Sequence, residues 1–184
     1  MISFYLSIIE TEEAKDKVVF IYENFYSFMC YSAGKVLNHN RHDVEDVVHN
    51  AMLKIIGIID LIDLSNVKKV KNLCGIVARN KAIDYCKRSN SQTISTDDET
   101  ALAVEDDATP DDIVISKEAY DIVIEAIRSL NDTYRDVCLL KYVHEYKVRE
   151  IAMMLDLSEN TVTTRLSRAK QILRKALRKE LPHV

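Results

Sequence analysis

The stretch YKVREIAMMLDLSENTVTTRLSRAKQILRKAL, residues 146–177, carries the strongest structural signal in this chain. Its first part repeats apolar side chains at the i, i+3, i+4, i+7 spacing of an amphipathic helix, at Val148, Ile151, Ala152 and Leu155. A second helical period follows the break at residues 156–158 and runs through Val162, Leu166, Ala169, Leu173 and Leu177. Two helices joined by such a short turn form a helix-turn-helix, with Ser158 as the expected N-cap of the second helix.

The outer side of this second helix is polar and basic. It carries Asn160, Thr161, Thr163, Thr164, Ser167 and Arg168. Hydroxyl and guanidinium groups of this kind reach base edges and phosphates in the major groove of DNA. The alternative is an amphipathic hairpin inside an ordinary core. Charge favours DNA, because residues 68–88 and 160–184 each hold seven basic side chains and one acidic one in a chain of net charge -4.

The composition predicts an all-α protein. The 184 residues include only three glycines and two prolines, while residues that favour helices are abundant. No apolar run is long enough to span a membrane, and the apolar start lacks a basic leader and a cleavage site, so we expect a cytoplasmic protein without membrane insertion. The cysteines are widely spaced, which favours reduced thiols over a zinc site or a disulfide framework.

Upstream of residue 90, three helices are expected. The predicted spans are Glu12–Leu37, a segment from Asp43 as N-cap to about Ile59, and Val67–Ser89, the last of them basic on its polar face. Residues 91–113 hold eight acidic side chains and no basic one, without periodicity, which predicts a flexible, disordered acidic linker. Beyond it, two helices around Ile122–Leu130 and Val137–Tyr142 are expected to pack beneath the helix-turn-helix.

We therefore predict two small helical domains, residues 1–90 and 114–184, joined by the linker at 91–113. One cluster in the first domain invites a metal interpretation: His39, His42, Asp43, Asp46 and His49. A polar, capped helix start explains the same residues. We favour it, because a helical metal hydrolase needs further ligands that other helices do not offer, and we expect no metal and no other cofactor.

Taken together, the two halves resemble the extracytoplasmic-function (ECF) group of RNA polymerase sigma factors. The residues that carry the resemblance are Asp43–Val48 and Ile76–Arg88 in the first half, and Leu130, Arg135–Val137, Glu150–Ser158, Thr161–Val162 and Arg165–Ala169 in the second. The first group looks like sigma regions 2.2 to 2.4, and the second group looks like region 4. Their order and spacing, with a linker where region 3 is absent, make this a strong resemblance. It covers the chain nearly from end to end.

The resemblance implies a role for each group of residues. Asp43, Asp46 and His49 would contact the clamp helices of core RNA polymerase. Arg79, Asn80, Lys81, Lys87 and Arg88 would bind the minus-10 element of promoter DNA, with Asn80 capturing a melted base. Thr163, Thr164, Ser167 and Arg168 would read the minus-35 element, while Arg149, Ser158, Thr161 and Arg165 hold phosphates. The resemblance further implies an anti-sigma factor as a regulator and no catalysis by the chain itself.

This chain departs from the family pattern at several positions. Asp156 stands where the turn usually has glycine, although aspartate tolerates the left-handed conformation better than most residues. His49 and Asn50 replace a frequent Gln-Glu pair, Leu73 stands near a frequent tryptophan, and Thr163 replaces a frequent lysine or arginine.

Two other classes of function remain open from the residues alone. A one-component regulator would bind an operator tightly without polymerase, typically as a dimer on a palindrome. A helical metal phosphohydrolase would use His42 and Asp43 and would contain a bound metal.

Overall fold

The computed structural model describes residues 2–89 and 117–180, with side chains in the second range from 120 to 177. In chain order the elements are α1 (Ile2–Ser7), α2 (Glu12–Gly34), α3 (Arg41–Gly57), the 3-10 turn η1 (Ile59–Leu61), α4 (Val67–Ser89), α5 (Lys117–Ser129), α6 (Asp132–Cys138), the π-helical turn η2 (Leu139–Val143), α7 (Val148–Leu155) and α8 (Glu159–Glu180). The predicted all-α class is confirmed. Among these helices, none is both long and apolar enough to cross a membrane.

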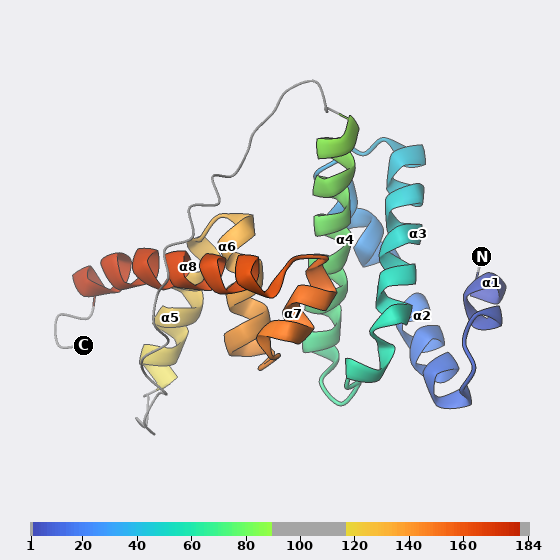
Figure 1. The fold of residues 1–184 in the computed structure, drawn as a ribbon, viewed down its shortest axis with the longest axis horizontal. Helices are drawn as coiled ribbons and strands as arrows, with labels where there is room; N and C mark the ends of the chain where they lie inside the picture. Colours follow the sequence, from blue (N-terminus) through green and yellow to red (C-terminus); the bar gives the residue numbers. More distant parts are fainter. Residues whose placement is uncertain (1, 90–116, 181–184) are drawn as a thin grey trace. The chain divides into compact units, whose positions relative to one another are not determined.

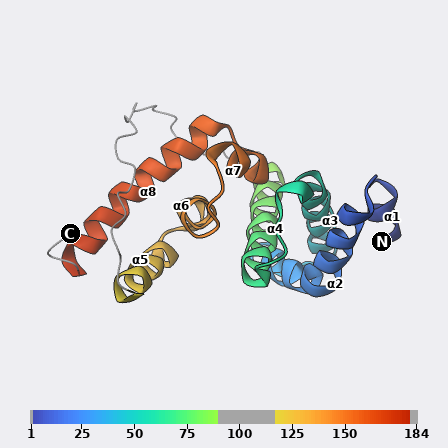
Figure 2. The same cartoon turned by 90° about the horizontal axis from the view of Figure 1, so that it is seen from below.

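The described residues form two compact units (Figure 1). The first consists of α1 to α4 together with Met153–Asp156 at the end of α7, and the second consists of α5, α6, the first part of α7 and α8. The acidic linker expected at residues 91–113 lies outside the described residues. In the first unit, α2, α3 and α4 pack side by side, and α1 lies against α2 (Figure 2). Their facing sides are apolar and buried, with Val18, Ile21, Met29, Val48, Met52, Ile55, Leu73 and Val77 at the centre. This core fixes the outer faces of α3 and α4, where the candidate site lies.

Helix α2 begins where the sequence predicts and ends three residues early. The Thr11 hydroxyl accepts a hydrogen bond from the Ala14 N–H at 3.3 Å, which caps the first turn. The helix stops at Gly34 rather than Leu37, because Asn38 and His39 adopt left-handed backbone angles with φ of 50° and 58°. The His39 N–H then donates to the Gly34 carbonyl at 2.9 Å and closes the helix end.

The predicted start of α3 at Asp43 is wrong. The helix begins at Arg41, and its N-cap is Asn40, which has extended backbone angles but makes no side-chain capping hydrogen bond. Asp43 therefore lies inside the first turn, where its charge still favours the helix dipole. Its carboxylate is available to another element, and the Tyr85 hydroxyl of α4 donates to it at 2.7 Å. The helix ends at Gly57, slightly before the predicted Ile59.

Helix α4 has the predicted bounds. The Asn66 side chain caps it by accepting a hydrogen bond from the Lys69 N–H at 3.1 Å. The apolar residues Val70, Leu73, Ile76 and Val77 are buried, and the Leu73 side chain lies in the core, where it cannot stack on a base. Tyr85 is 36% exposed and turns its hydroxyl towards α3.

In the second unit, α5 and α6 pack against α8, as predicted for helices beneath the helix-turn-helix. The buried side chains here include Ile127, Leu130, Val137, Cys138 and Leu140. The predicted helix through Tyr142 continues from α6 into the π-helical turn η2. A π turn is wider than an α turn, so it shifts the phase of the apolar face. Tyr142 is consequently 43% exposed instead of buried.

The N-cap of α6 offers a local test of this packing. The Asn131 side chain accepts a hydrogen bond from the Tyr134 N–H at 3.1 Å. We expect Asn131→Ala to lower the free energy of unfolding of the second unit by about 0.5–2 kcal/mol, because a backbone donor loses its partner. Denaturant titration followed by circular dichroism measures this change. Thr133→Ala, at an exposed position two residues later, should change stability little, and equal losses for both variants would contradict the capping role.

All four cysteines are free thiols. Burial raises the pKa of Cys74 to about 12 and the pKa of Cys138 to about 11. Both thiols therefore stay protonated near neutral pH and act as small apolar core residues.

Candidate nucleic-acid interface

The turn between α7 and α8 has the geometry of a helix-turn-helix, and both helices have the predicted starts. Asp156 follows the last residue of α7 with φ of 54°, in the left-handed region. The Leu157 N–H donates to the Ala152 carbonyl at 3.0 Å, which is the long hydrogen bond of a Schellman motif. Asp156 therefore occupies the left-handed position that glycine usually fills in this turn, as expected from the sequence.

Side-chain caps fix the start of each helix. The Ser158 hydroxyl accepts from the Thr161 N–H at 3.1 Å, which confirms it as the N-cap of α8. A further hydrogen bond of 2.8 Å joins the Ser158 and Thr161 hydroxyls. At α7, the Lys147 N–H donates to the Glu150 carboxylate at 2.8 Å, as in a capping box. The first turns of both helices are thus held by short local contacts, which limits their freedom before any ligand binds.

Helix α8 separates a buried side from a polar side. The buried side consists of Val162, Leu166, Ala169 and Leu173. With 3.6 residues per turn, Thr164 lies opposite it, at the centre of the polar side, with Ser167 and Arg168 about equally far to its two sides. Thr163 lies further round beyond Ser167, while Thr161 and Arg165 lie beyond Arg168. Arg149 is exposed on α7.

The Thr163 hydroxyl is already used within the helix. It donates to the Glu159 carbonyl one turn earlier at 3.0 Å. This bond uses the hydrogen of the hydroxyl, so the oxygen of Thr163 can still accept a hydrogen bond but cannot donate one. The threonine methyl can in addition contact the methyl of thymine.

The five residues of α4 assigned to the minus-10 element do not share one side of the helix. Asn80 and Lys87 are seven residues apart and lie on one side, while Lys81 and Arg88, also seven apart, lie on another, and Arg79 falls on a third. The Asn80 amide donates to the Ile76 carbonyl at 2.9 Å, so one of its amide hydrogens is engaged with its own helix. The set therefore divides between one face with Asn80 and Lys87 and a neighbouring face with Lys81 and Arg88, and Arg79 lies apart from both.

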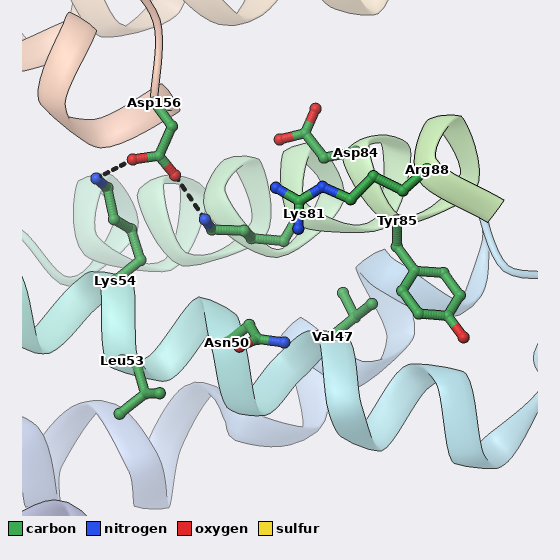
Figure 3. A pocket seen from close by; sticks show the side chains of 9 residues that line it. All are labelled: Val47, Asn50, Leu53, Lys54, Lys81, Asp84, Tyr85, Arg88 and Asp156. Atoms are coloured by element: carbon green, nitrogen blue, oxygen red, sulfur yellow. Dashed lines mark hydrogen bonds and ion pairs between the residues drawn. The ribbon is translucent and has the colours of Figure 1, made fainter. Parts of the chain in front are cut away.

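Lys81 and Arg88 line a groove between α3 and α4 (Figure 3). The α3 wall of this groove includes Asn50 and Lys54. Three cationic side chains thus face the groove from the two helices, together with the carboxylates of Asp84 and Asp156, and Asp156 forms ion pairs with both Lys54 and Lys81. Lys54 shares this surface with Lys81 only because α3 packs against α4.

The outer strip of α3 holds the three residues assigned to core polymerase, each in a different environment. Asp46 is exposed, whereas Asp43 accepts the hydrogen bond from Tyr85 and His49 forms a 2.9 Å hydrogen bond with the Tyr5 hydroxyl of α1. The hydrogen bond to Asp43 raises the pKa of Tyr85, because it stabilises the protonated phenol. The hydrogen bonds of Tyr5 with His49 and of Tyr85 with Asp43 were not predicted from the sequence.

The same contacts explain the residues that suggested a metal site. The Asp43 and His49 side chains are engaged with tyrosines of two other helices, and His39 belongs to the left-handed turn that ends α2. Within residues 2–89 and 117–180, no three His, Cys, Asp or Glu side chains gather as ligands for a metal ion. The arrangement is that of a polar helix start.

Comparisons with known proteins agree with this geometry. Residues 120–173, which extend from α5 into α8, match the family model described as sigma-70, region 4. Over 175 residues, the chain is 30% identical to the ECF RNA polymerase sigma factor SigW of Bacillus subtilis (strain 168). That alignment covers 91% of this chain and 90% of the relative, so it includes both units.

Proposed function

Because the chain belongs to the extracytoplasmic-function (ECF) group of RNA polymerase sigma factors, we propose that it binds core RNA polymerase and directs transcription initiation at promoters that it recognises. One observation carries the proposal: the alignment with SigW spans both the basic helix α4 and the helix-turn-helix. The protein then acts in the cytoplasm, as a specificity subunit without a catalytic step of its own. The division into residues 1–90, a linker at 91–113 and residues 114–184 is part of this proposal.

The second unit reads the minus-35 element. Its recognition helix α8 enters the major groove with its polar side, as recognition helices of this motif do. Thr164, at the centre of that side, contacts base edges together with Thr163, Ser167 and Arg168. Residues at the edges and on α7 contact phosphates: Arg149, Ser158, Thr161 and Arg165. The local caps described above support this assignment, because they orient the first turn of α8 in advance.

The first unit binds the minus-10 element through α4. Lys81 and Arg88 hold the phosphate backbone along the groove between α3 and α4, while Asn80, with Lys87 on the same side and Arg79 nearby, engages the opened strand. Lys54 adds to the same cationic surface, because it lines the groove opposite Lys81. The groove thus combines charge from two helices.

The outer strip of α3 binds core polymerase through Asp43, Asp46 and His49. Its two carboxylates suit a partner surface with basic and polar side chains. An anti-sigma factor would regulate the protein by covering surfaces of both units. This regulator follows from the family alone, and no residue of the chain identifies it.

Run-off transcription with purified core polymerase tests the proposal. We expect the protein to bind core at submicromolar concentration and to produce transcripts from promoters identified by sequencing RNA ends after overexpression. Failure to bind core at micromolar concentration would refute the sigma-factor function. Tight duplex binding by the protein alone, as a dimer on a palindrome, would instead support a one-component regulator.

Asn80→Ala separates strand opening from duplex binding. If the amide captures a melted base, we expect open-complex formation to fall by about 2- to 12-fold, the effect of losing one neutral hydrogen bond. Permanganate footprinting measures opening, and a mobility shift on unmelted duplex measures binding. Lys87→Ala, on the same side of α4, should reduce both readouts together and in a salt-dependent manner. Equal losses in the two assays for Asn80→Ala would argue against base capture.

A further inference from the structure

Helix α1 was not anticipated from the sequence, and it lies against the strip of α3 that we assign to core polymerase. Tyr5 anchors it, because the ring is fully buried and packs 6.1 Å from the ring of Tyr22 on α2. The Tyr5 and His49 rings are stacked, with centroids 5.5 Å apart and planes 26° from parallel. The hydroxyl of the same tyrosine forms the 2.9 Å hydrogen bond with Nδ1 of His49. His49 is therefore held in place by α1 through two contacts.

The hydrogen bond also couples the tautomer of His49 to the Tyr5 phenol, because either group could be the donor. Burial raises the pKa of Tyr5 to about 12, so the phenol keeps its proton near neutral pH and can donate. With the phenol as donor, Nδ1 of the neutral imidazole accepts and Nε2 carries the proton. A histidine held in this form presents an N–H group, as the amide of the more usual glutamine at this position also does.

Phe4 stands beside the same histidine but remains on the surface. Its ring centroid is 5.7 Å from that of His49, and its side chain is 51% exposed. An exposed aromatic ring next to a polar, acidic strip is the arrangement of a binding anchor with a polar surround. One turn along α3, Asp46 is exposed as well, so apolar and acidic groups are available on one continuous surface.

We propose that α1 forms part of the surface that binds core RNA polymerase, with Tyr5 as a positioning residue for His49 and Phe4 as a direct contact. This inference rests on the proposed sigma-factor function. The partner surface that fits has an apolar patch for Phe4, a basic side chain for Asp46 and a polar group for Nε2 of His49. Phe4 lies next to His49, which we assign to the surface that binds core polymerase. We therefore take core polymerase as the partner that Phe4 contacts.

The positioning role predicts non-additive effects on core affinity. Tyr5→Phe keeps the buried ring and removes only the hydroxyl, so we expect core binding to weaken by about 2- to 12-fold. In a His49→Ala background the same change should have little further effect, because the partner of the Tyr5 hydroxyl is gone. Affinity is measured by fluorescence competition with labelled protein and purified core. Fully additive losses would show that Tyr5 acts only through general stability and would overturn its positioning role.

The direct contact is tested with exposed aromatic residues of matched accessibility. Phe4→Ala should weaken core binding by about 5- to 30-fold, as expected for an interface anchor, without changing thermal stability. Tyr31→Ala removes a ring that is 54% exposed near the other end of α2 and should leave core affinity unchanged. If the wild-type protein binds core and Phe4→Ala binds within twofold of it, this inference is wrong while the sigma-factor function stands. If the wild-type protein does not bind core, both fail.

Discussion

Replacing Arg168 by alanine is expected to weaken promoter binding by the holoenzyme by about 1–3 kcal/mol, or roughly 5- to 150-fold, and to relax preference at one position of the minus-35 element. Arg168 lies on the polar side of α8, beside Thr164 and away from the buried Val162 and Leu166. A guanidinium at this place can donate two hydrogen bonds to one guanine, and alanine can donate none. Competition binding with promoters that carry each base at each minus-35 position measures both effects.

Two further substitutions separate base reading from charge. Arg168→Lys keeps the positive charge but cannot form the bidentate pair, so it should lose most of the base preference and less of the affinity. Lys170→Ala removes a positive charge from an exposed position near the buried side of α8 and should leave base preference unchanged. An unchanged preference in Arg168→Ala would remove this residue from the reading set.

The sequence predicted helices best where periodicity and caps agreed. Helix α8 follows a serine that caps it, and α4 follows Asn66, so a short polar residue marks each start. Helix α3 lacks such a mark, because Asn40 makes no side-chain cap and the preceding turn depends on left-handed residues. Helix α1 is six residues long, which is too short to be stable alone. It is held by the burial of Tyr5 against other helices, and this tertiary contact could not be predicted from the sequence.

The candidate site was predictable as a set of residue types, but not as a surface. The basic residues of α4 are close in sequence, yet successive residues on a helix point 100° apart, so Asn80 and Lys81 belong to different faces. The groove that joins Lys54 to Lys81 depends on how α3 packs against α4. The same dependence hid the contacts of Tyr5 and Tyr85 with α3, because each joins residues more than forty positions apart.

Ile151→Asp is expected to unfold the second unit while leaving the first unit folded. Ile151 is fully buried in α7, and an unpaired carboxylate placed there should cost about 4 kcal/mol or more. That cost is comparable with the whole stability of a small unit, at roughly 0.05–0.15 kcal/mol per residue. Hydrogen exchange should show lost protection in α5 to α8 and retained protection in α2 to α4. Binding to core through α3 should persist, and discrimination of minus-35 sequences should disappear.

The matched control is Met153→Asp, which introduces the same charge into the same helix at a side chain that is 45% exposed. We expect this variant to keep its exchange protection throughout, because the new carboxylate stays hydrated. Loss of protection in α2 to α4 of Ile151→Asp would show that the two units fold together, contrary to the proposed division. Selective loss in the second unit would instead mean that the two promoter-binding surfaces are built on separate cores, so that polymerase, rather than a shared core, sets the distance between them.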